Sequence, residues 1–281
     1  DEKVSLAKRT QLRLRNSAQL STLDHLDVAL SPTPWQKTAF PDAYRHKIGV
    51  CHDGIDVHRC RPNPQGTLKM PDGRVLRAGD PVVTYVARDL EPYRGFPTFM
   101  RSAAKLAARN PDAVFVVAGG DGVSYGTPRT DGRKWRDVMM EETGLDPSRI
   151  YFLGQISHEH LIRLFQISAA HIYLTYPFVL SWSVLEAMAC GVAVIASDTG
   201  PCHDVIKDRY NGLLTDFWDA DTLADKMIYS LENPARLIPL RQEARRIITQ
   251  HFALQKCLEK QTSLIERLAA GEIERVVGRR G

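Results

Sequence analysis

A short helix that follows two serines offers the clearest chemistry in this sequence. Residues Ser183–Ala189 are predicted to be helical, and Gly191 can adopt the left-handed conformation that ends a helix. The apolar run 192–196 that follows predicts a buried parallel strand. Ser181 and Ser183 stand at positions typical of N-caps, so the helix would offer backbone N–H groups and its positive dipole end to an anion.

Glu186 lies one turn into this helix. Its carboxylate would repel a phosphate bound at the helix start, and we therefore expect it to face hydroxyl groups. The alternative is a buried, paired carboxylate with a structural role. A phosphate beside a polyol is the chemistry of a sugar nucleotide, which is the ligand that this pattern indicates.

Two arginines flank the turn RDLEPYR, which follows an apolar strand predicted at 82–87. The forked guanidinium groups of Arg88 and Arg94 match the oxygens of a diphosphate. Two solvated surface arginines are the alternative. We favour a diphosphate clamp because the turn is predicted to lie at the same sheet edge as the start of the Ser183 helix.

The glycine-rich run 119–122 follows an apolar strand predicted at 113–118. Gly120 and Asp121 are its candidate ligand contacts. The run either lets the backbone approach a phosphate or a base, or forms a tight turn. It does not match GxGxxG and no helix is predicted directly after it, so it gives little support to a dinucleotide-binding fold.

Strands and helices alternate from Pro81 onward. Apolar strands are predicted at 82–87, 113–118, 150–153, 171–176 and 192–196, with helices between them. This alternation predicts an α/β fold with a doubly wound parallel sheet and helices on both faces. Ligands of such sheets bind at the carboxyl ends of the strands, so the turns named above should lie along one edge.

The residues before Pro81 are less regular. The segment 61–80 is rich in proline, glycine and charge, which predicts a linker or hairpin and the best candidate for a domain boundary. Closing helices are predicted over 219–232, 234–250 and 253–268. A helix over residues 4–25 is expected to be buried through its leucines, Leu6, Leu12, Leu14, Leu20 and Leu23.

The composition is that of an ordinary globular protein, with 43% hydrophobic and 25% charged residues among 281. The net charge of +4 fits an anionic small molecule or an acidic membrane surface, and it is too small to indicate nucleic acid. No apolar run approaches the length of a membrane span, and the charged first residues do not form a signal peptide. We therefore predict a cytoplasmic location, with peripheral contact at the inner face of a membrane left open.

Five scattered cysteines indicate reduced thiols rather than a disulfide framework. Cys51, His52, His58 and Cys60 are close in sequence, but their spacing matches no zinc pattern. We therefore predict no metal site. The other histidines, among them His158, are interpreted as surface or capping residues rather than catalysts.

Six motifs in a fixed order extend these predictions. They are SPTPWQKTAFP with VCHDGID, VTYVARDLEPYRGF, VFVVAGGDG, RIYFLGQIS, SVLEAMACGVAVIASDTGP and NGLLTDFWDADTLADKM. In this order, over about residues 28–265, they resemble the C-terminal half of retaining GT-B glycosyltransferases of the group 1 family. The resemblance implies a GT-B type, Rossmann-like fold and a nucleotide-diphosphate sugar as the donor.

The resemblance also assigns the site residues. It implies that Arg88 and Arg94 grip the donor diphosphate and that Glu186 binds the ribose hydroxyls. The helix start, Ser183–Val184, would offer backbone amides to the phosphate. The base is expected against the turn Leu153–Gly154.

One loop departs from the family pattern. Phe178 stands where the first glutamate of a Glu-x7-Glu pair is expected, and Val179 and Ser181 replace the usual glycines. Because this loop touches the donor sugar in the family, the sequence leaves the sugar open. Two alternatives follow: a non-catalytic sugar-nucleotide-binding or scaffold protein, and a sugar-nucleotide epimerase on the same architecture.

The resemblance divides the chain into three parts. Residues 1–60 would be a remnant of the N-terminal, acceptor-side domain with its hinge, 61–250 the donor-binding domain, and 251–281 a crossover helix and tail. The implied reaction moves a hexose-type sugar, with retention, to an unknown acceptor such as a glycan or a lipid-linked compound. No cofactor or metal is expected, because the two arginines and the helix dipole would stabilise the leaving diphosphate. This chain alone is expected to bind nucleotide weakly and to turn over nothing.

Overall fold

The computed structural model describes residues 5–272, so the last part of the predicted tail lies outside the described residues. The chain forms two compact units. One contains the residues up to Asp53 together with those from Cys257 onward, and the other contains Gly54–Lys256. The division of the chain at residues 60 and 250 stays a prediction.

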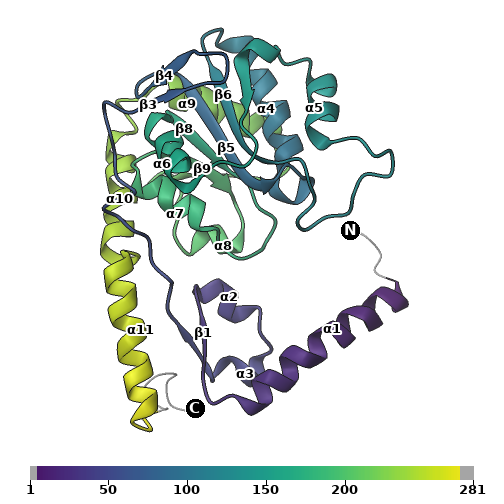
Figure 1. Cartoon of the computed structure of the whole chain (residues 1–281), viewed down its shortest axis with the longest axis vertical. Coiled ribbons are helices and arrows are strands. Elements are labelled where there is room, and N and C mark those ends of the chain that lie inside the picture. Colours follow the sequence, from purple (N-terminus) through teal and green to yellow (C-terminus); the bar gives the residue numbers. More distant parts are fainter. Residues whose placement is uncertain (1–4, 273–281) are drawn as a thin grey trace. The chain divides into compact units, whose positions relative to one another are not determined.

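The larger unit is built on a six-stranded sheet whose strand order is β10-β9-β8-β5-β6-β7. Figure 1 labels β5, β6, β8 and β9 of this sheet. Every neighbouring pair in it is parallel. In β5, for example, Thr84 lies between Val116 of β6 and His171 of β8. The strands are β5 (Val82–Asp89), β6 (Val114–Gly120), β7 (Ile150–Phe152), β8 (Ala170–Tyr173), β9 (Ala193–Ser197) and β10 (Leu213–Thr215).

The order of the strands reverses between β5 and β8. From β5 the chain adds β6 and β7 on one side, and it then returns to add β8, β9 and β10 on the other. Such a reversal leaves a crevice at the carboxyl ends of the two central strands, which is where open α/β sheets bind ligands. The predicted doubly wound parallel sheet is therefore confirmed, and the reversal identifies the part of its edge to inspect.

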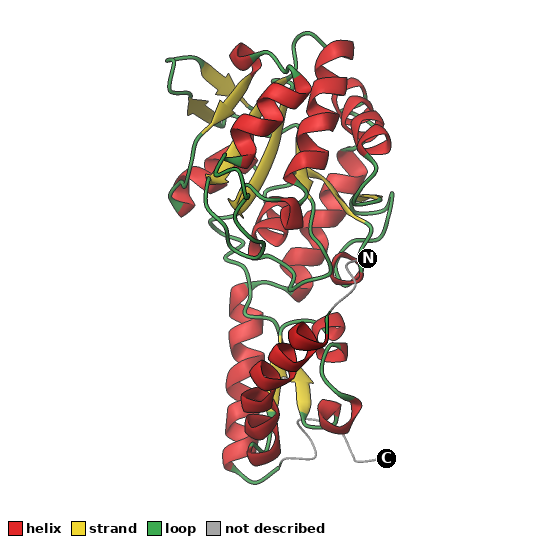
Figure 2. Cartoon of the chain, turned by 90° about the vertical axis from the view of Figure 1, so that its right-hand side faces the viewer, coloured by secondary structure: helices red, strands yellow, loops and turns green. Residues whose placement is uncertain are grey.

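Helices cover both faces of the sheet (Figure 2). Alternate residues of β5 point to opposite faces, so Val83 and Tyr85 belong to one buried cluster while Val82 belongs to another. On the Tyr85 face lie α4 (Phe96–Arg109), α5 (Trp135–Thr143) and α9 (Ala220–Glu232). On the other face lie α6 (His158–Ile167), α7 (Trp182–Ala189) and most of α10 (Ile238–His251).

The proline- and glycine-rich segment is an antiparallel hairpin of β3 (Thr67–Lys69) and β4 (Val75–Arg77). Its inward residues, Leu68 and Leu76, are buried in the same cluster as Val82. The remaining elements of this unit are short: η1 (Pro92–Arg94), η2 (Pro147–Arg149) and α8 (Gly200–His203).

The smaller unit contains a two-stranded parallel sheet of β1 (Ala29–Ser31) and β2 (Ile48–Val50). Its helices are α1 (Leu6–His25), α2 (Pro34–Thr38), α3 (Asp42–Arg45) and most of α11 (Leu254–Ala269). Lys260 of α11 donates to the carbonyl oxygen of Val50 at 2.9 Å, which ties this helix to β2. The expected burial of α1 is wrong, because Leu23 alone of its five leucines is buried.

Candidate functional site

The candidate site is a pocket of about 290 Å³ at the carboxyl ends of the central strands. One wall is formed by the end of β5, which carries Arg88, and by η1, which carries Arg94, and the other is the loop between β8 and α7. The pocket is lined by Val86, Ala87, Arg88, Arg94, Tyr125, Phe178, Val179, Ser181 and Ser183. The predicted convergence of the two arginines with the start of the Ser183 helix is thus observed.

A larger cavity, of about 720 Å³, lies elsewhere in the same unit. Its lining includes residues of α9, of α10 and of the segments before β10 and α10, together with Leu213, the first residue of β10. That position belongs to the amino end of the strand, the edge opposite to the one where sheets of this type bind ligands. The smaller pocket is therefore the candidate site.

Arg94 is held in place on several sides. It is buried at the end of η1, and its Nη1 donates to Oγ1 of Thr175 at 3.0 Å. Its guanidinium carbon lies 5.5 Å from the ring centre of Tyr173 and 5.9 Å from that of Tyr125. These contacts orient the guanidinium group before a ligand arrives.

The main chain at Arg94 is fixed as well. The hydroxyl of Tyr85 donates to the carbonyl oxygen of Arg94 at 2.6 Å. Burial raises the pKa of both Tyr85 and Tyr173 further above the ordinary value of a phenol, which is already neutral at neutral pH. Gly95 has φ +71°, and a Cβ there would lie 2.4 Å from the Cβ of Leu174. The chain can pass this close to the end of β8 only because residue 95 has no side chain.

Arg88 differs from Arg94 in its surroundings. It is exposed at the end of β5, and its side chain lines the same pocket. An exposed guanidinium is free to adjust to a ligand, whereas Arg94 is already positioned. Together they bring two positive charges to one pocket.

Two acidic side chains, which the sequence patterns did not single out, position the loop after β6. Asp89 accepts from the backbone N–H of Gly122 at 3.0 Å and from the hydroxyl of Ser124. Glu91 is 1% exposed and accepts from the backbone N–H groups of Tyr125, at 3.1 Å, and of Gly126, at 2.9 Å. The signal for this role was their place in the RDLEPYR turn, between the two arginines.

This loop forms the aromatic wall of the pocket. Because Glu91 holds its backbone, the ring of Tyr125 packs on that of Phe178, with 4.8 Å between the ring centres. Phe178 is half exposed, at 42%. The residue that replaces the expected glutamate therefore gives the pocket an apolar surface instead of a carboxylate.

The glycines of the 119–122 run make room for Asp89. A Cβ at Gly120 would lie 2.6 Å from Oδ1 of Asp89, and one at Gly122 would lie 2.9 Å from it. Asp121 pairs instead with Lys134 and Arg136, each at 3.2 Å. These contacts favour the tight-turn interpretation, and ligand contact by Gly120 and Asp121 stays a prediction.

The turn predicted to face the base lies beside this run. The N–H of Gly119 donates to the carbonyl oxygen of Gly154 at 2.9 Å, and that of Leu153 donates to Val117 at 2.9 Å. Leu153 and Gly154 are half-buried and do not line the pocket. Their role toward a base stays a prediction.

The start of α7 corrects one detail of the predicted anion site. Ser181 is the N-cap, and its Oγ accepts from the backbone N–H of Ser183 at 3.3 Å. Ser183 is therefore a helical residue, not a second cap, and its N–H is already engaged. Val184 is fully buried. As predicted, Gly191 ends the helix region with φ +73°, and β9 follows.

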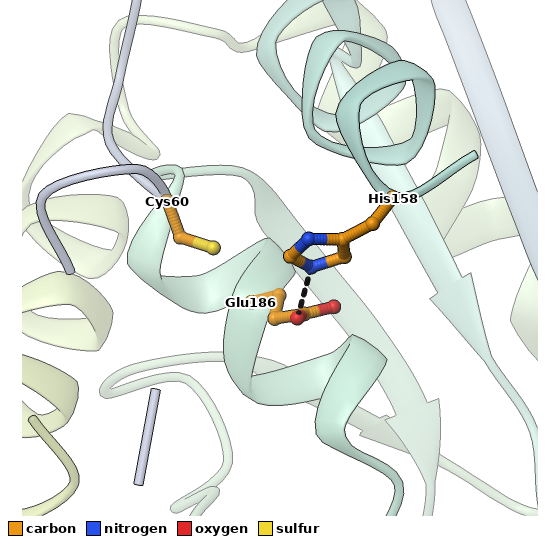
Figure 3. Close-up of side chains that lie close together, drawn as sticks. All are labelled: Cys60, His158 and Glu186. Atoms are coloured by element: carbon orange, nitrogen blue, oxygen red, sulfur yellow. Dashed lines mark hydrogen bonds and ion pairs between the residues drawn. The ribbon is translucent and has the colours of Figure 1, made fainter. Parts of the chain in front are cut away.

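Glu186 lies one turn deeper in α7 and is buried. Its Oε1 accepts from Nε2 of His158, the first residue of α6, at 2.7 Å. The thiol of Cys60 lies beside this pair (Figure 3). In the structure Glu186 thus faces a histidine, while its expected contact with ribose hydroxyls stays a prediction.

Comparison with known families gives two matches. Residues 69–250 match the family model described as Glycosyl transferases group 1. Residues 1–60 match the model described as Glycosyl transferase family 4 group. Within residues 5–272, no helix is long and apolar enough to cross a membrane.

The chain matches curated relatives over part of their length. A D-inositol 3-phosphate glycosyltransferase of Rhodococcus jostii is 28% identical over 207 residues, which is 72% of this chain and 43% of the relative. The D-inositol 3-phosphate glycosyltransferase of a Nocardioides strain is 26% identical over 245 residues, which is 84% of this chain and 52% of the relative. The chain therefore spans about half the length of these relatives.

Solved structures share the fold. Sucrose-phosphate synthase from Thermosynechococcus elongatus has a TM-score of 0.76 at 22% identity, over 92% of this chain and 62% of that one. Anabaena HepE in complex with UDP and glucose has a TM-score of 0.75 at 19% identity, over 94% of this chain and 69% of that one. The expected GT-B type of α/β fold is confirmed by these neighbours.

Proposed function

The chain belongs to the group 1 family of glycosyltransferases, and we propose that its larger unit binds the diphosphate of a nucleotide-diphosphate sugar. The whole protein would then transfer the sugar to an acceptor with retention of configuration. The observation that carries this proposal is the joint lining of one pocket by Arg88 and Arg94. Among the residues lining that pocket there is no carboxylate to cancel their charge.

The two arginines would act on the leaving group. When the bond between the sugar and the diphosphate breaks, negative charge develops on the diphosphate oxygens. Fixed positive groups aimed at that charge stabilise the transition state without reorganising, and Arg94 is such a group because Thr175 holds it. Arg88 and the start of α7 would complete the diphosphate site, and Glu186 would bind the ribose by releasing His158.

UDP is the nucleotide to test first, because the fold neighbour HepE was solved with UDP and with UDP-glucose. The acceptor is proposed to be a glycan or a lipid-linked compound. We expect this chain alone to bind nucleotide without transferring sugar, because it spans about half the length of its relatives.

Isothermal titration calorimetry of this chain with UDP and with GDP tests the donor site. We expect one nucleotide per chain, and an affinity lowered about tenfold or more by Arg88→Ala, since hydrogen bonds to charged groups contribute roughly 1.5–3 kcal/mol. Arg109→Ala is the matched control, because Arg109 is an exposed arginine of α4 paired with Asp225. Equal affinity of the wild type and Arg88→Ala would count against the proposed site.

A transfer assay separates this function from its alternatives. A longer protein that contains this chain would be incubated with UDP-glucose and a set of glycan and lipid-linked acceptors, and the products would be analysed by NMR. An α-linked product from the α-linked donor indicates retaining transfer. An epimerised nucleotide sugar would identify an epimerase, and tight binding without any product would identify a binding or scaffold protein.

A further inference from the structure

The strongest unexplained cluster in the larger unit is formed by Cys60, His158 and Glu186 (Figure 3). One potential metal-ligand atom of each residue lies within 4.8 Å of the other two. Cys60 and Glu186 are buried, whereas the His158 side chain is 46% exposed. Among the described residues no other group of three or more such side chains meets in this way.

The fold holds the three residues together from separate elements. Glu186 belongs to α7 and His158 starts α6. Arg245 of α10 donates to the carbonyl oxygen of Cys60 at 3.0 Å and also to that of Ala189, near the end of α7. Arg245 thus ties the segment that carries Cys60 to the helix that carries Glu186.

We propose that Cys60, His158 and Glu186 bind one Zn²⁺ ion. Thiolate, imidazole and carboxylate are the ligands that this borderline-soft cation takes in proteins, and three of them leave a fourth tetrahedral position for water. The exposure of His158 gives that position access to solvent. The proposed site does not depend on the function proposed above.

Metal binding requires small movements of the three ligand atoms and a change in the position of two protons. Around a tetrahedral Zn²⁺ the ligand atoms would be about 3.5 Å apart. The 2.7 Å distance between Nε2 of His158 and Oε1 of Glu186 must therefore lengthen, and the longest distance among the three ligand atoms, which lie within 4.8 Å of one another, must shorten. Nε2 of His158 must offer its lone pair, which leaves the ring proton on Nδ1. Cys60 must release its thiol proton to solvent.

Zn²⁺ would take the Glu186 carboxylate away from a ribose. This consequence rests on the proposed donor site, and it predicts that Zn²⁺ weakens the binding of UDP. If Zn²⁺ binds with the expected ligands and the UDP affinity does not change, the cation site is supported and the coupling is overturned.

The test is a titration of the chelator-treated chain with Zn²⁺, with bound metal measured by mass spectrometry of the separated protein. Co²⁺ is the optical probe, because a thiolate ligand gives an intense charge-transfer absorption. We expect one ion per chain, a thiolate–Co²⁺ band, and affinity lowered at least roughly tenfold by Cys60→Ser or by His158→Gln.

Two controls make the result specific. His203→Gln removes an exposed histidine that pairs with Asp198, and Cys51→Ser removes a buried thiol of the smaller unit. Both should bind Zn²⁺ as the wild type does.

Because Cys60 is buried and its variant can lose stability, His158→Gln at the exposed start of α6 is the decisive variant. Substoichiometric binding, or equal affinity in His158→Gln and the wild type, would overturn the site.

Discussion

The guanidinium group of Arg94 donates a 3.0 Å hydrogen bond to the hydroxyl of Thr175, 81 residues further along the chain. This bond joins the turn after β5 to the end of β8, the two strands between which the strand order reverses. Both residues are buried. Doubly wound sheets have a crevice where the strand order reverses, and this bond fixes the positive charge of Arg94 in that crevice.

Thr175→Val should weaken the binding of UDP roughly tenfold. Valine keeps the shape of threonine but cannot accept from Arg94, so the guanidinium loses the contact that orients it. Calorimetry measures the affinity, and a thermal unfolding scan checks that the variant is folded. Thr143→Val is the control, because that hydroxyl donates within α5 to Met139 and should leave UDP affinity unchanged. Wild-type affinity in Thr175→Val would contradict the positioning role.

Gly95→Ala should lower the free energy of unfolding by about 3 kcal/mol. Part of the loss is the cost of φ +71° for a residue with a side chain, and the rest is the overlap of the new Cβ with Leu174, 2.4 Å away. Urea unfolding of both proteins measures the difference.

Gly132→Ala separates these two costs. Gly132 has φ +69°, but no atom lies within 4 Å of the position that a Cβ would take, so its substitution should cost about 1 kcal/mol, the cost of the left-handed conformation alone. Equal losses for the two variants would show that the approach of Gly95 to Leu174 is not as close as the structure describes.

Glu91→Gln should loosen the loop that carries Tyr125. The charged carboxylate accepts from two backbone N–H groups, while a neutral amide offers a single oxygen and a weaker acceptor. We expect a stability loss of about 1–3 kcal/mol and faster hydrogen exchange at the amides of Tyr125 and Gly126. Hydrogen–deuterium exchange mass spectrometry measures this. Asp146→Asn, which changes a similar acceptor at η2, should leave the loop unaffected.

His171 should make the protein acid-labile. Burial lowers its pKa to about 3, whereas an unfolded histidine has a pKa near 6.5. Between these pH values His171 is protonated in the unfolded chain but not in the native chain. The free energy of unfolding therefore falls as the pH falls through this window, by up to about 1.4 kcal/mol per pH unit.

The pH dependence can be assigned with one variant. His171→Asn keeps a polar group near Thr84, whose hydroxyl lies 3.0 Å from Nδ1 of His171. This variant should be less stable at neutral pH but should lose less stability between pH 6 and pH 4, as urea unfolding at each pH would show. His160→Asn, at an exposed position of α6, should keep the wild-type slope. An unchanged slope in His171→Asn would place the acid sensitivity at other groups.

The sheet and the general position of the site were predictable from local signals. Val114–Ala118 is a run of apolar residues and Gly191 follows a helix, and both patterns depend only on near neighbours in the sequence. The carboxyl ends of parallel strands share one edge, so Arg88 and Arg94 could be placed at it before any contact was known. The expectation that α1 is buried was wrong, and the leucines of this helix gave it little support because they follow no strongly amphipathic pattern.

The sequence by itself determined the fold, the family motifs and the edge of the sheet to which the two arginines belong. Only the tertiary structure decided the partners of each side chain. Glu186 pairs with His158, 28 residues away, and Glu91 accepts from a loop 34 residues beyond it. Periodicity and turn chemistry are local properties of the chain, whereas these contacts depend on how the helices and loops pack on the sheet.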